Sequence, residues 1–270
     1  MRLTVKVPGS CGEFVQGMLN GEPFLITCPV NLFTTVTISD ESDEQIGLGW
    51  KAEAMLNKIL EYLGSKTFDF GIALESELPI GKGMASSSAD IAAVGKATAL
   101  ALGNDLKAEE IAALAASIEP TDGVFYDGIV VMNPLNGQVL SRIKPQPGYK
   151  IAVFDFGGNV DTLDFKRRSN FNLAKLPDRF DLNMATASAL ANQEILPKPQ
   201  LEDIIHLANS FGALGVTTAH TGTVIGVIFA EDTNQAYIES ISSILTNSFN
   251  QITFLATVKL ISGGFYVNRY

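Results

Sequence analysis

The chain has 270 residues, of which 46% are hydrophobic and 18% are charged, so it can bury a large core and is not an intrinsically disordered protein. The formal net charge of −10 argues against an extended nucleic-acid or anionic-membrane surface. Cys11 and Cys28 are too few for a disulfide scaffold and lack metal-ligand spacing, so we expect a reducing, cytoplasmic setting. No secretory signal and no bilayer-spanning apolar run is visible in the sequence.

Strand and helix patterns alternate along the first half of the chain. Residues 2–8 alternate and are β-branched, which predicts a strand that ends at Pro8-Gly9. Apolar residues at helical spacing, stopped by a glycine, predict a helix over 51–64. The remaining predictions in chain order are strands over 24–39 and 68–79, helices over 87–102 and over 105–119 (opened by Asp105), and a hairpin over 127–143 that turns at Asn136-Gly137.

Two prolines and a glycine in KPQPGY, residues 144–149, predict a linker, after which the strand pattern restarts. The second half predicts strands over 150–158 and 223–230, helices over 181–192, 201–214 and 234–245, and a closing strand region over 254–268. Because the alternation lacks regular βαβ spacing, it favours two α+β layers that meet at a cleft. We therefore expect one lobe over 1–145 and a second over 146–270.

The segment PIGKGMASSSAD, residues 79–90, joins a predicted strand to an Ala-rich helix. Its spacing excludes a Walker loop and a dinucleotide-binding fingerprint, because serines stand where those motifs need glycine. The residue types still suit phosphate. Gly81 and Gly83 can turn successive N–H groups toward one point, Lys82 adds a cation, and the helix N-terminus adds its dipole. The alternative is a plain junction in which Ser87 caps the helix and Asp90 closes a capping box.

The same segment resembles the second motif of the GHMP kinase superfamily, P-x-x-x-G-L-G-S-S-A, with Met84 and Ala85 in place of Leu and Gly. PGSCGEFVQG (8–17) and HTGTVIGVIF (220–229) stand where that family has its first and third motifs. Together with EPTDG (119–123) and FDFGGNVDT (154–162), the residues of these segments resemble those of the L-threonine kinase branch. Enzymes of that branch make O-phospho-L-threonine for the aminopropanol linker of cobalamin.

This resemblance implies a two-lobed α+β fold, with an N-terminal lobe like ribosomal protein S5 domain 2 and a ferredoxin-like C-terminal lobe. It also implies ATP and Mg²⁺ as cofactors. Ser87 and Glu119 would hold the metal, with Glu110 as the alternative to Glu119. Asp122 would accept the substrate's hydroxyl proton, although Asp before Gly is also ordinary turn chemistry. The residues implied for ATP are Pro79, Gly81, Lys82, Gly83, Met84, Ala85, Ser86, Ser87 and Ser88.

An amino-acid substrate needs an acidic group for its ammonium and polar donors for its carboxylate. The candidates are Glu13, Gln16, Asp161, Thr162, His220 and Thr221. His220 could equally be a structural donor to the backbone, and Cys11 fits a small buried side chain better than a nucleophile. We expect a small-molecule substrate, no nucleic acid, no membrane, and a monomer or homodimer.

The favoured function is therefore ATP-dependent phosphorylation of the side-chain hydroxyl of L-threonine. Homoserine kinase is the nearest alternative, because homoserine is an isomer of threonine, and another small-molecule kinase of the GHMP superfamily is the broader one. A kinase-like protein that binds its ligands without catalysis is the alternative from a different functional class.

Overall fold

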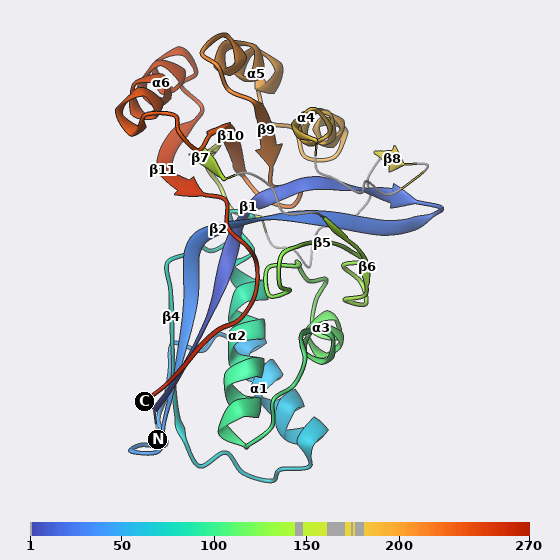
Figure 1. Ribbon diagram of the computed structural model, residues 1–270, viewed down its shortest axis with the longest axis vertical. Helices are drawn as coiled ribbons and strands as arrows, with labels where there is room; N and C mark the ends of the chain where they lie inside the picture. The colour runs from blue at the N-terminus through green and yellow to red at the C-terminus, as the bar shows by residue number, and fades with distance from the viewer. Residues whose placement is uncertain (1, 144–147, 161–170, 174, 176–180) are drawn as a thin grey trace.

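The computed structural model describes residues 2–143, 148–160, 171–173, 175 and 181–270 (Figure 1). The helices are α1 (Trp50–Leu63), α2 (Ser86–Ala101), α3 (Ala108–Ala116), α4 (Leu182–Ala191), α5 (Leu201–Ser210) and α6 (Gln235–Ser248), with a 3₁₀ turn at Asn192–Glu194. The strands are β1 (Arg2–Leu19), β2 (Glu22–Ser39), β3 (Gln45–Ile46), β4 (Gly71–Ser76), β5 (Ile129–Met132), β6 (Val139–Ile143), β7 (Tyr149–Asp155), β8 (Asn172–Leu173), β9 (Gly215–Thr218), β10 (Val224–Ala230), β11 (Thr253–Lys259) and β12 (Tyr266–Arg269). The mixed helix and strand content predicted from the sequence is confirmed.

A long antiparallel hairpin of β1 and β2 runs through both parts of the molecule (Figure 1). Its register shifts three times, first between Pro8 and Gly9 and then on either side of Glu13. The prediction that the first strand ends at Pro8-Gly9 is therefore wrong. Bulges absorb the irregular residues and re-aim side chains while pairing with β2 continues. The segment 8–17 consequently lies inside a strand, where the bulges turn Glu13 toward other elements.

One curled sheet contains the β1–β2 hairpin and extends from it in both directions, in the order β11-β7-β10-β9-β1-β2-β4-β3. The first part of β1 also pairs with β12, and the far part of β2 pairs with the β5–β6 hairpin. Both ends of the described chain therefore lie together at one end of the molecule (Figure 1). The hairpin predicted at Asn136-Gly137 is confirmed.

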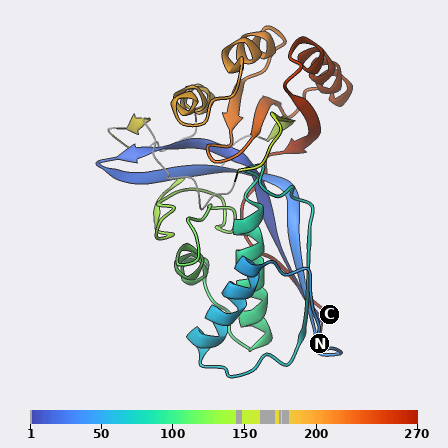
Figure 2. The ribbon, with the colours of Figure 1, turned by 180° about the vertical axis from the view of Figure 1, so that it is seen from behind.

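Helices α1, α2 and α3 lie at one end of the molecule and α4, α5 and α6 at the other, as both ribbon views show (Figures 1 and 2). Strands β7 and β10 contribute alternate residues to two cores, as a strand's period of two requires. Ile151 and Val153 join the larger core, whereas Ala152 and Phe154 face α5 and α6 in the smaller one. Within the described ranges, no helix is long and apolar enough to cross a membrane.

Most predicted helices are confirmed within one to a few residues, but the start of α3 is not where the sequence predicted it. Asp105 does not open this helix, because its carboxylate pairs with the Lys96 ammonium of α2. The helix begins at Ala108, where the Glu110 carboxylate accepts a hydrogen bond from the backbone N–H of Lys107, 2.8 Å away. Glu110 thereby caps the backbone at the start of the helix in place of the predicted Asp105 cap.

The division of the chain at residue 145 and the likeness of each half to a known lobe stay predictions. Residues 144–147 of the expected linker lie outside the described part of the chain, and β7 begins at Tyr149. The sheet is continuous across the proposed boundary, and β12 from the second half pairs with β1.

The loop before α2 and the turn after β9 come from distant parts of the chain and meet backbone to backbone. A Cβ atom built on Gly222 would collide with the carbonyl oxygen of Lys82 and with the Cα atom of Gly83. The backbone N–H groups of Thr223 and Val224 donate to that same Lys82 oxygen, at 2.9 and 3.2 Å. Only glycine permits this approach, so the turn after β9 fixes the position of the loop before α2.

We expect Gly222→Ala to lower the free energy of unfolding by about 1–3 kcal/mol, because the added methyl has to push two backbone segments apart. Thermal denaturation followed by circular dichroism measures the change. Gly49→Ser is the control, because a Cβ atom at Gly49 meets nothing within 4 Å and serine is accepted at the N-cap of α1 at least as well as glycine. Equal melting temperatures for Gly222→Ala and wild type would contradict the close approach.

Candidate active site

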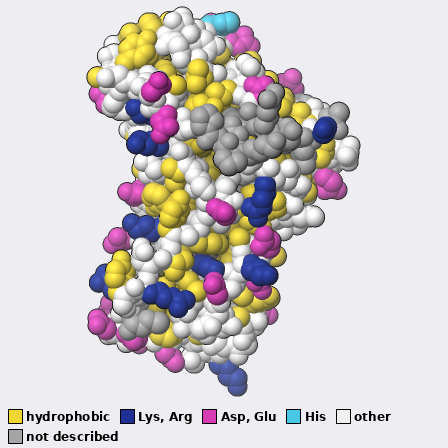
Figure 3. Space-filling view, in the orientation of Figure 1, with side chains coloured by type: hydrophobic (Ala, Val, Ile, Leu, Met, Phe, Trp, Pro, Cys, Tyr) yellow, Lys and Arg dark blue, Asp and Glu magenta, His cyan; other side chains and the backbone are white. Residues whose placement is uncertain are grey.

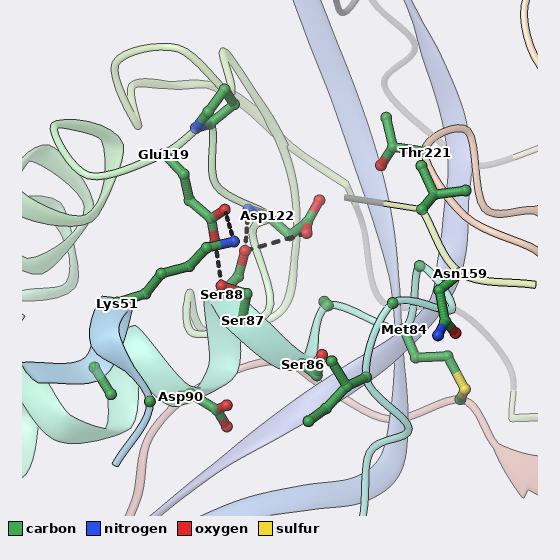
Figure 4. Close-up of a pocket in the computed structure, with 18 of the residues that line it drawn as sticks. Lys51, Met84, Ser86, Ser87, Ser88, Asp90, Glu119, Asp122, Asn159 and Thr221 are labelled. Carbon is green, nitrogen blue, oxygen red and sulfur yellow. Dashed lines mark hydrogen bonds and ion pairs between the residues drawn. The ribbon is translucent and has the colours of Figure 1, made fainter. Parts of the chain in front are cut away.

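A pocket of about 460 Å³ opens where α1, α2, the loop before α2 and the segment after α3 meet (Figure 4). Glu13 of β1, Asn159 and Val160 of the loop after β7, and Thr221 of the turn after β9 close it from the other side. The other lining residues are Gly49, Trp50, Lys51, Ala52, Ile80, Gly81, Gly83, Met84, Ala85, Ser86, Ser87, Ser88, Asp90, Glu119, Pro120 and Asp122. The segments quoted from the sequence as 8–17, 79–90, 119–123, 154–162 and 220–229 therefore all contribute residues to one pocket.

The loop before α2 turns sharply because three of its residues adopt left-handed backbone conformations. The φ angles are +73° at Gly81, +80° at Gly83 and +57° at Ala85. Ala85 is the N-cap of α2 and no side chain caps this helix, so the N–H groups of its first turn border the pocket without a side-chain cap. The positive end of the helix dipole therefore points at the pocket.

The alternative in which Ser87 caps α2 and Asp90 closes a capping box is wrong. The left-handed turn at Ala85 starts the helix at Ser86, which places Ser87 inside the first turn. Asp90 instead accepts a hydrogen bond of 2.6 Å from the Thr34 hydroxyl of β2. The side chains of Ser87 and Asp90 are thus released from capping, and both line the pocket.

Ser87 and Glu119 are brought together at the floor of the pocket. The Ser87 hydroxyl donates to Glu119 Oε1, and the Lys51 ammonium donates to Glu119 Oε2 at 2.6 Å (Figure 4). Glu119 follows α3 and its side chain is almost fully buried, whereas Lys51 comes from the first turn of α1. The pair offers one hydroxyl oxygen and one carboxylate, which are the hard oxygen ligands that Mg²⁺ prefers.

Ser88 and Asp122 form a second buried pair beside the first. The Ser88 hydroxyl lies 3.2 Å from Asp122 Oδ2 and accepts a 3.1 Å hydrogen bond from the Asp122 backbone N–H (Figure 4). The neighbouring Thr121 and Gly123 N–H groups donate to Pro134 O and to Thr27 Oγ1. These anchors fix the turn, so the Asp122 carboxylate is held toward α2 and the pocket.

Glu13 enters the pocket from the opposite side and is held by the turn after β9. Its Oε2 accepts a 2.9 Å hydrogen bond from the His220 backbone N–H and lies 3.3 Å from His220 Nδ1. Because Nδ1 also faces the carbonyl of Thr218, we assign the ring proton to Nδ1. Nε2 then accepts from the Ser188 hydroxyl, 3.0 Å away. His220 is buried behind Glu13, so it orients that carboxylate.

Several residues selected from the sequence lie away from the pocket lining. Lys82 directs its ammonium to Asp155 Oδ2 at 2.7 Å and to the carbonyl of Gly158 at 2.6 Å. Gln16 is buried and its backbone N–H donates to Ser188 Oγ at 3.1 Å. The lining contains neither of these residues, nor Pro79 or Glu110. Asp161 and Thr162 lie outside the described residues.

Cys11 has no exposed surface, and burial, with a smaller contribution from the nearby Glu13 charge, raises the pKa of its thiol to about 12. A thiol with that pKa is not a nucleophile at neutral pH, because only the thiolate reacts. The sequence interpretation of Cys11 as a small buried side chain is confirmed.

Sequence reasoning missed the contribution of α1. Gly49, Trp50 and Lys51 line the pocket, but nothing local in the sequence distinguishes the start of this helix from any other. Asp90 was interpreted only as a capping residue. Asn159 also lines the pocket. It lies in the segment 154–162, whose resemblance to the family was the signal that could have identified it.

The residues of the pocket fit a metal-bound nucleotide. The loop at Gly81–Ala85 and the start of α2 present backbone N–H groups of the kind that hold phosphate. A Cβ atom on Gly83 would strike Ala219 Cβ and reach within 2.8 Å of Gly222 Cα, so the loop is held tightly from behind. Ser87 and Glu119 would hold the Mg²⁺, which would offset the charge of the phosphates.

Comparison with known proteins agrees with this architecture. A model of the GHMP kinases N terminal domain matches residues 51–128. The L-threonine kinase of Citrobacter freundii is 31% identical over 265 residues, covering 88% of this chain and 90% of that protein. The L-threonine kinase of Salmonella typhimurium is 30% identical over 243 residues, covering 82% of this chain and 81% of that protein.

A solved homoserine kinase structure from Cytophaga hutchinsonii superposes with a TM-score of 0.65 at 19% identity, covering 99% of this chain and 97% of that one. The two proteins therefore share a fold although their sequences are only 19% identical. The identity to curated kinases over most of both chains, the domain match and the common fold lead to one conclusion. This chain belongs to the GHMP kinase family and is a phosphotransferase that acts on an alcohol group of a small molecule.

Proposed function

We propose that this protein is an L-threonine kinase that transfers the γ-phosphoryl group of ATP to the side-chain hydroxyl of L-threonine. The family implies ATP as the phosphoryl donor. The observation that carries the choice of threonine is the similarity to two L-threonine kinases, each at about 30% identity over more than four fifths of this chain. The product, O-phospho-L-threonine, would serve cobalamin synthesis as it does in that branch of the family.

The reaction forms a bond between the threonine Oγ atom and the γ-phosphorus, and it breaks the bond from that phosphorus to the β,γ-bridging oxygen. ADP leaves, and the hydroxyl proton passes to a base. Asp122 is our candidate for that base, because its carboxylate is anchored at the pocket beside α2. The chemistry otherwise needs positioning and charge neutralisation rather than a covalent intermediate.

Ser87 and Glu119 would hold the Mg²⁺, and the loop at Gly81–Ala85 would hold the phosphates. The contact between Ser87 and Glu119 supports this pairing over one with Glu110. Glu110 instead caps α3 and accepts a hydrogen bond from Tyr62 on the surface. Mg²⁺ usually keeps several waters, so one carboxylate and one hydroxyl suffice with the phosphates.

Glu13 is our candidate for binding the ammonium group of threonine. It is the acidic residue on the pocket wall formed by β1, and His220 holds its Oε2 in place. Thr221, which also lines this wall, offers a hydroxyl for the substrate carboxylate. Gln16 and His220 would act from behind this wall, because neither lines the pocket.

Homoserine kinase is the second candidate, because the solved homoserine kinase shares this fold over nearly the whole chain. A protein that binds nucleotide without catalysis is the remaining candidate, and the assembled Ser87–Glu119 and Ser88–Asp122 pairs argue against it. We propose a monomer or homodimer that works in the cytoplasm, where ATP is present and where the two free cysteines stay reduced.

ADP release measured with L-threonine, L-serine, L-homoserine and mevalonate tests the proposed function. We expect turnover with L-threonine to exceed that with homoserine, because two L-threonine kinases share about 30% identity with this chain over more than four fifths of its length. Product analysis by ³¹P NMR identifies the phosphate ester. Faster turnover with homoserine would make the second candidate correct, and nucleotide binding without turnover would favour the non-catalytic one.

Asp122→Asn tests the assignment of the base. The substitution keeps the size of the side chain and its contact with Ser88 but removes the basic carboxylate. General-base catalysis contributes about 10²–10⁴-fold, so we expect kcat to fall by that factor while the KM for ATP changes little. If Asp122 only holds its turn, Asn would serve nearly as well, and a variant that keeps more than roughly a tenth of wild-type kcat would refute the assignment.

Asp90 places a further negative charge in the pocket. Burial is the main cause that raises the pKa of its carboxyl to about 6. The hydrogen bond from Thr34 lowers this pKa, and the Glu119 charge raises it, each by a smaller amount. The unfolded chain would titrate near 3.8. The folded state therefore binds this proton more tightly. The stability that this proton gives is fully present below pH 3.8 and is lost as the pH rises through about 6.

Asp90→Asn should therefore stabilise the protein at pH 7.5, by about 3 kcal/mol, because it removes a buried charge while Thr34 can still donate to the amide oxygen. The gain should shrink toward zero as the pH falls to about 4. Melting temperatures of both proteins between pH 4 and 8 measure this difference. Asp232→Asn, at an exposed position, is the control. A stability difference that does not vary with pH would exclude Asp90 as its source.

A further inference from the structure

Lys51 is the only cationic side chain among the described residues that line the pocket. Four acidic residues share that lining, namely Glu13, Asp90, Glu119 and Asp122. Lys82, the cation of the phosphate loop, is committed to Asp155 and to the carbonyl of Gly158. A nucleotide that brings several negative charges into this pocket therefore meets one described ammonium group.

That ammonium is occupied by Glu119. Its Nζ atom lies 2.6 Å from Glu119 Oε2, and the Glu119 side chain is 2% exposed. A buried carboxylate needs such a counter-charge, because an unpaired buried charge is strongly destabilising. The Lys51 side chain is 19% exposed and extends from the first turn of α1, so its end can move without disturbing the helix.

A divalent cation at this carboxylate would compete with the ion pair, because Glu119 Oε1 already accepts from the Ser87 hydroxyl and Oε2 accepts from the Lys51 ammonium. When a cation binds between Ser87 and Glu119, it takes over the neutralisation of Glu119 and repels the ammonium. Lys51 then needs a new anionic partner at the pocket, and phosphate oxygens are strong acceptors for an ammonium group.

We propose that Lys51 exchanges partners during the catalytic cycle. It pairs with Glu119 while the site is empty, and its ammonium moves to the phosphates of the nucleotide when a divalent cation takes Glu119. The exchange makes cation binding without nucleotide unfavourable and couples the two ligands. This inference rests on the proposed use of Ser87 and Glu119 as metal ligands.

Lys51→Met tests the exchange, because the two ligands should respond in opposite directions. Mn²⁺ binding to the nucleotide-free protein is measured from the EPR signal of the free ion. ADP binding is measured at saturating Mg²⁺ by the fluorescence of Trp50, which is the only tryptophan and whose ring centroid lies 5.6 Å from the Lys51 ammonium. Lys58→Met is the matched control, since Lys58 lies two turns further along α1 and outside the pocket lining.

We expect Lys51→Met to bind Mn²⁺ roughly tenfold or more tightly than wild type, because the competing ammonium is gone. The same variant should bind ADP roughly tenfold or more weakly at saturating Mg²⁺, because a charged hydrogen bond to phosphate is lost. Lys51→Arg should stay closer to wild type in both measurements. Glu119→Gln should bind Mn²⁺ more weakly, and Lys58→Met should match wild type.

A Lys51→Met protein that binds Mn²⁺ and ADP as wild type does would overturn the proposal. So would a parallel loss of both affinities, because that result would mean that Lys51 only supports the structure around Glu119. The melting temperature of each variant shows whether it is folded. The Mn²⁺ measurement needs neither nucleotide nor alcohol, so failure of the threonine assay leaves this test intact.

Discussion

The contact between the Gly83 and Gly222 backbones determines where the rest of the site can lie. The loop before α2 contains left-handed residues and has no side-chain cap, so alone it would sample many conformations. The turn after β9 restrains it through two hydrogen bonds to Lys82 O, and Val160 N–H donates to Gly81 O from a third segment. β1 adds a bond from Ser10 N–H to Met84 O. Three separate parts of the chain thus hold this one loop.

Charge balance is the second constraint on the pocket. The overall charge is −10, and on the face seen in Figure 3 the Lys and Arg side chains are interspersed among Asp and Glu. An anionic substrate therefore depends on local groups, namely the N-terminus of α2, the loop N–H groups and Lys51. Because each of these acts over a short range, the pocket gains affinity for phosphate only when its geometry is intact.

The sequence predicted the parts of the structure that depend on local patterns. Helices α1, α2 and α4 to α6 were predicted from the spacing of their apolar residues and from the glycines and prolines at their ends. The Ser87–Glu119 pairing was anticipated only through the family resemblance, because the two residues come from different elements. Lys51 was missed for the same reason, since its partner is 68 positions away. The continuation of β1 beyond Pro8 was missed because bulges are set by the partner strand and not by local composition.

The pairing of β12 with β1 joins residues from opposite ends of the described chain, for example Leu3 with Arg269. Contacts of such high sequence separation form late, because the loop-closure entropy must be overcome first. During synthesis one edge of β1 stays open until β12 has emerged, and an open edge can pair with another molecule. The strand that carries Glu13 into the pocket is therefore completed only when residues 266–269 are available to pair with it. We infer that the yield of native protein is sensitive to how well nascent chains are kept apart.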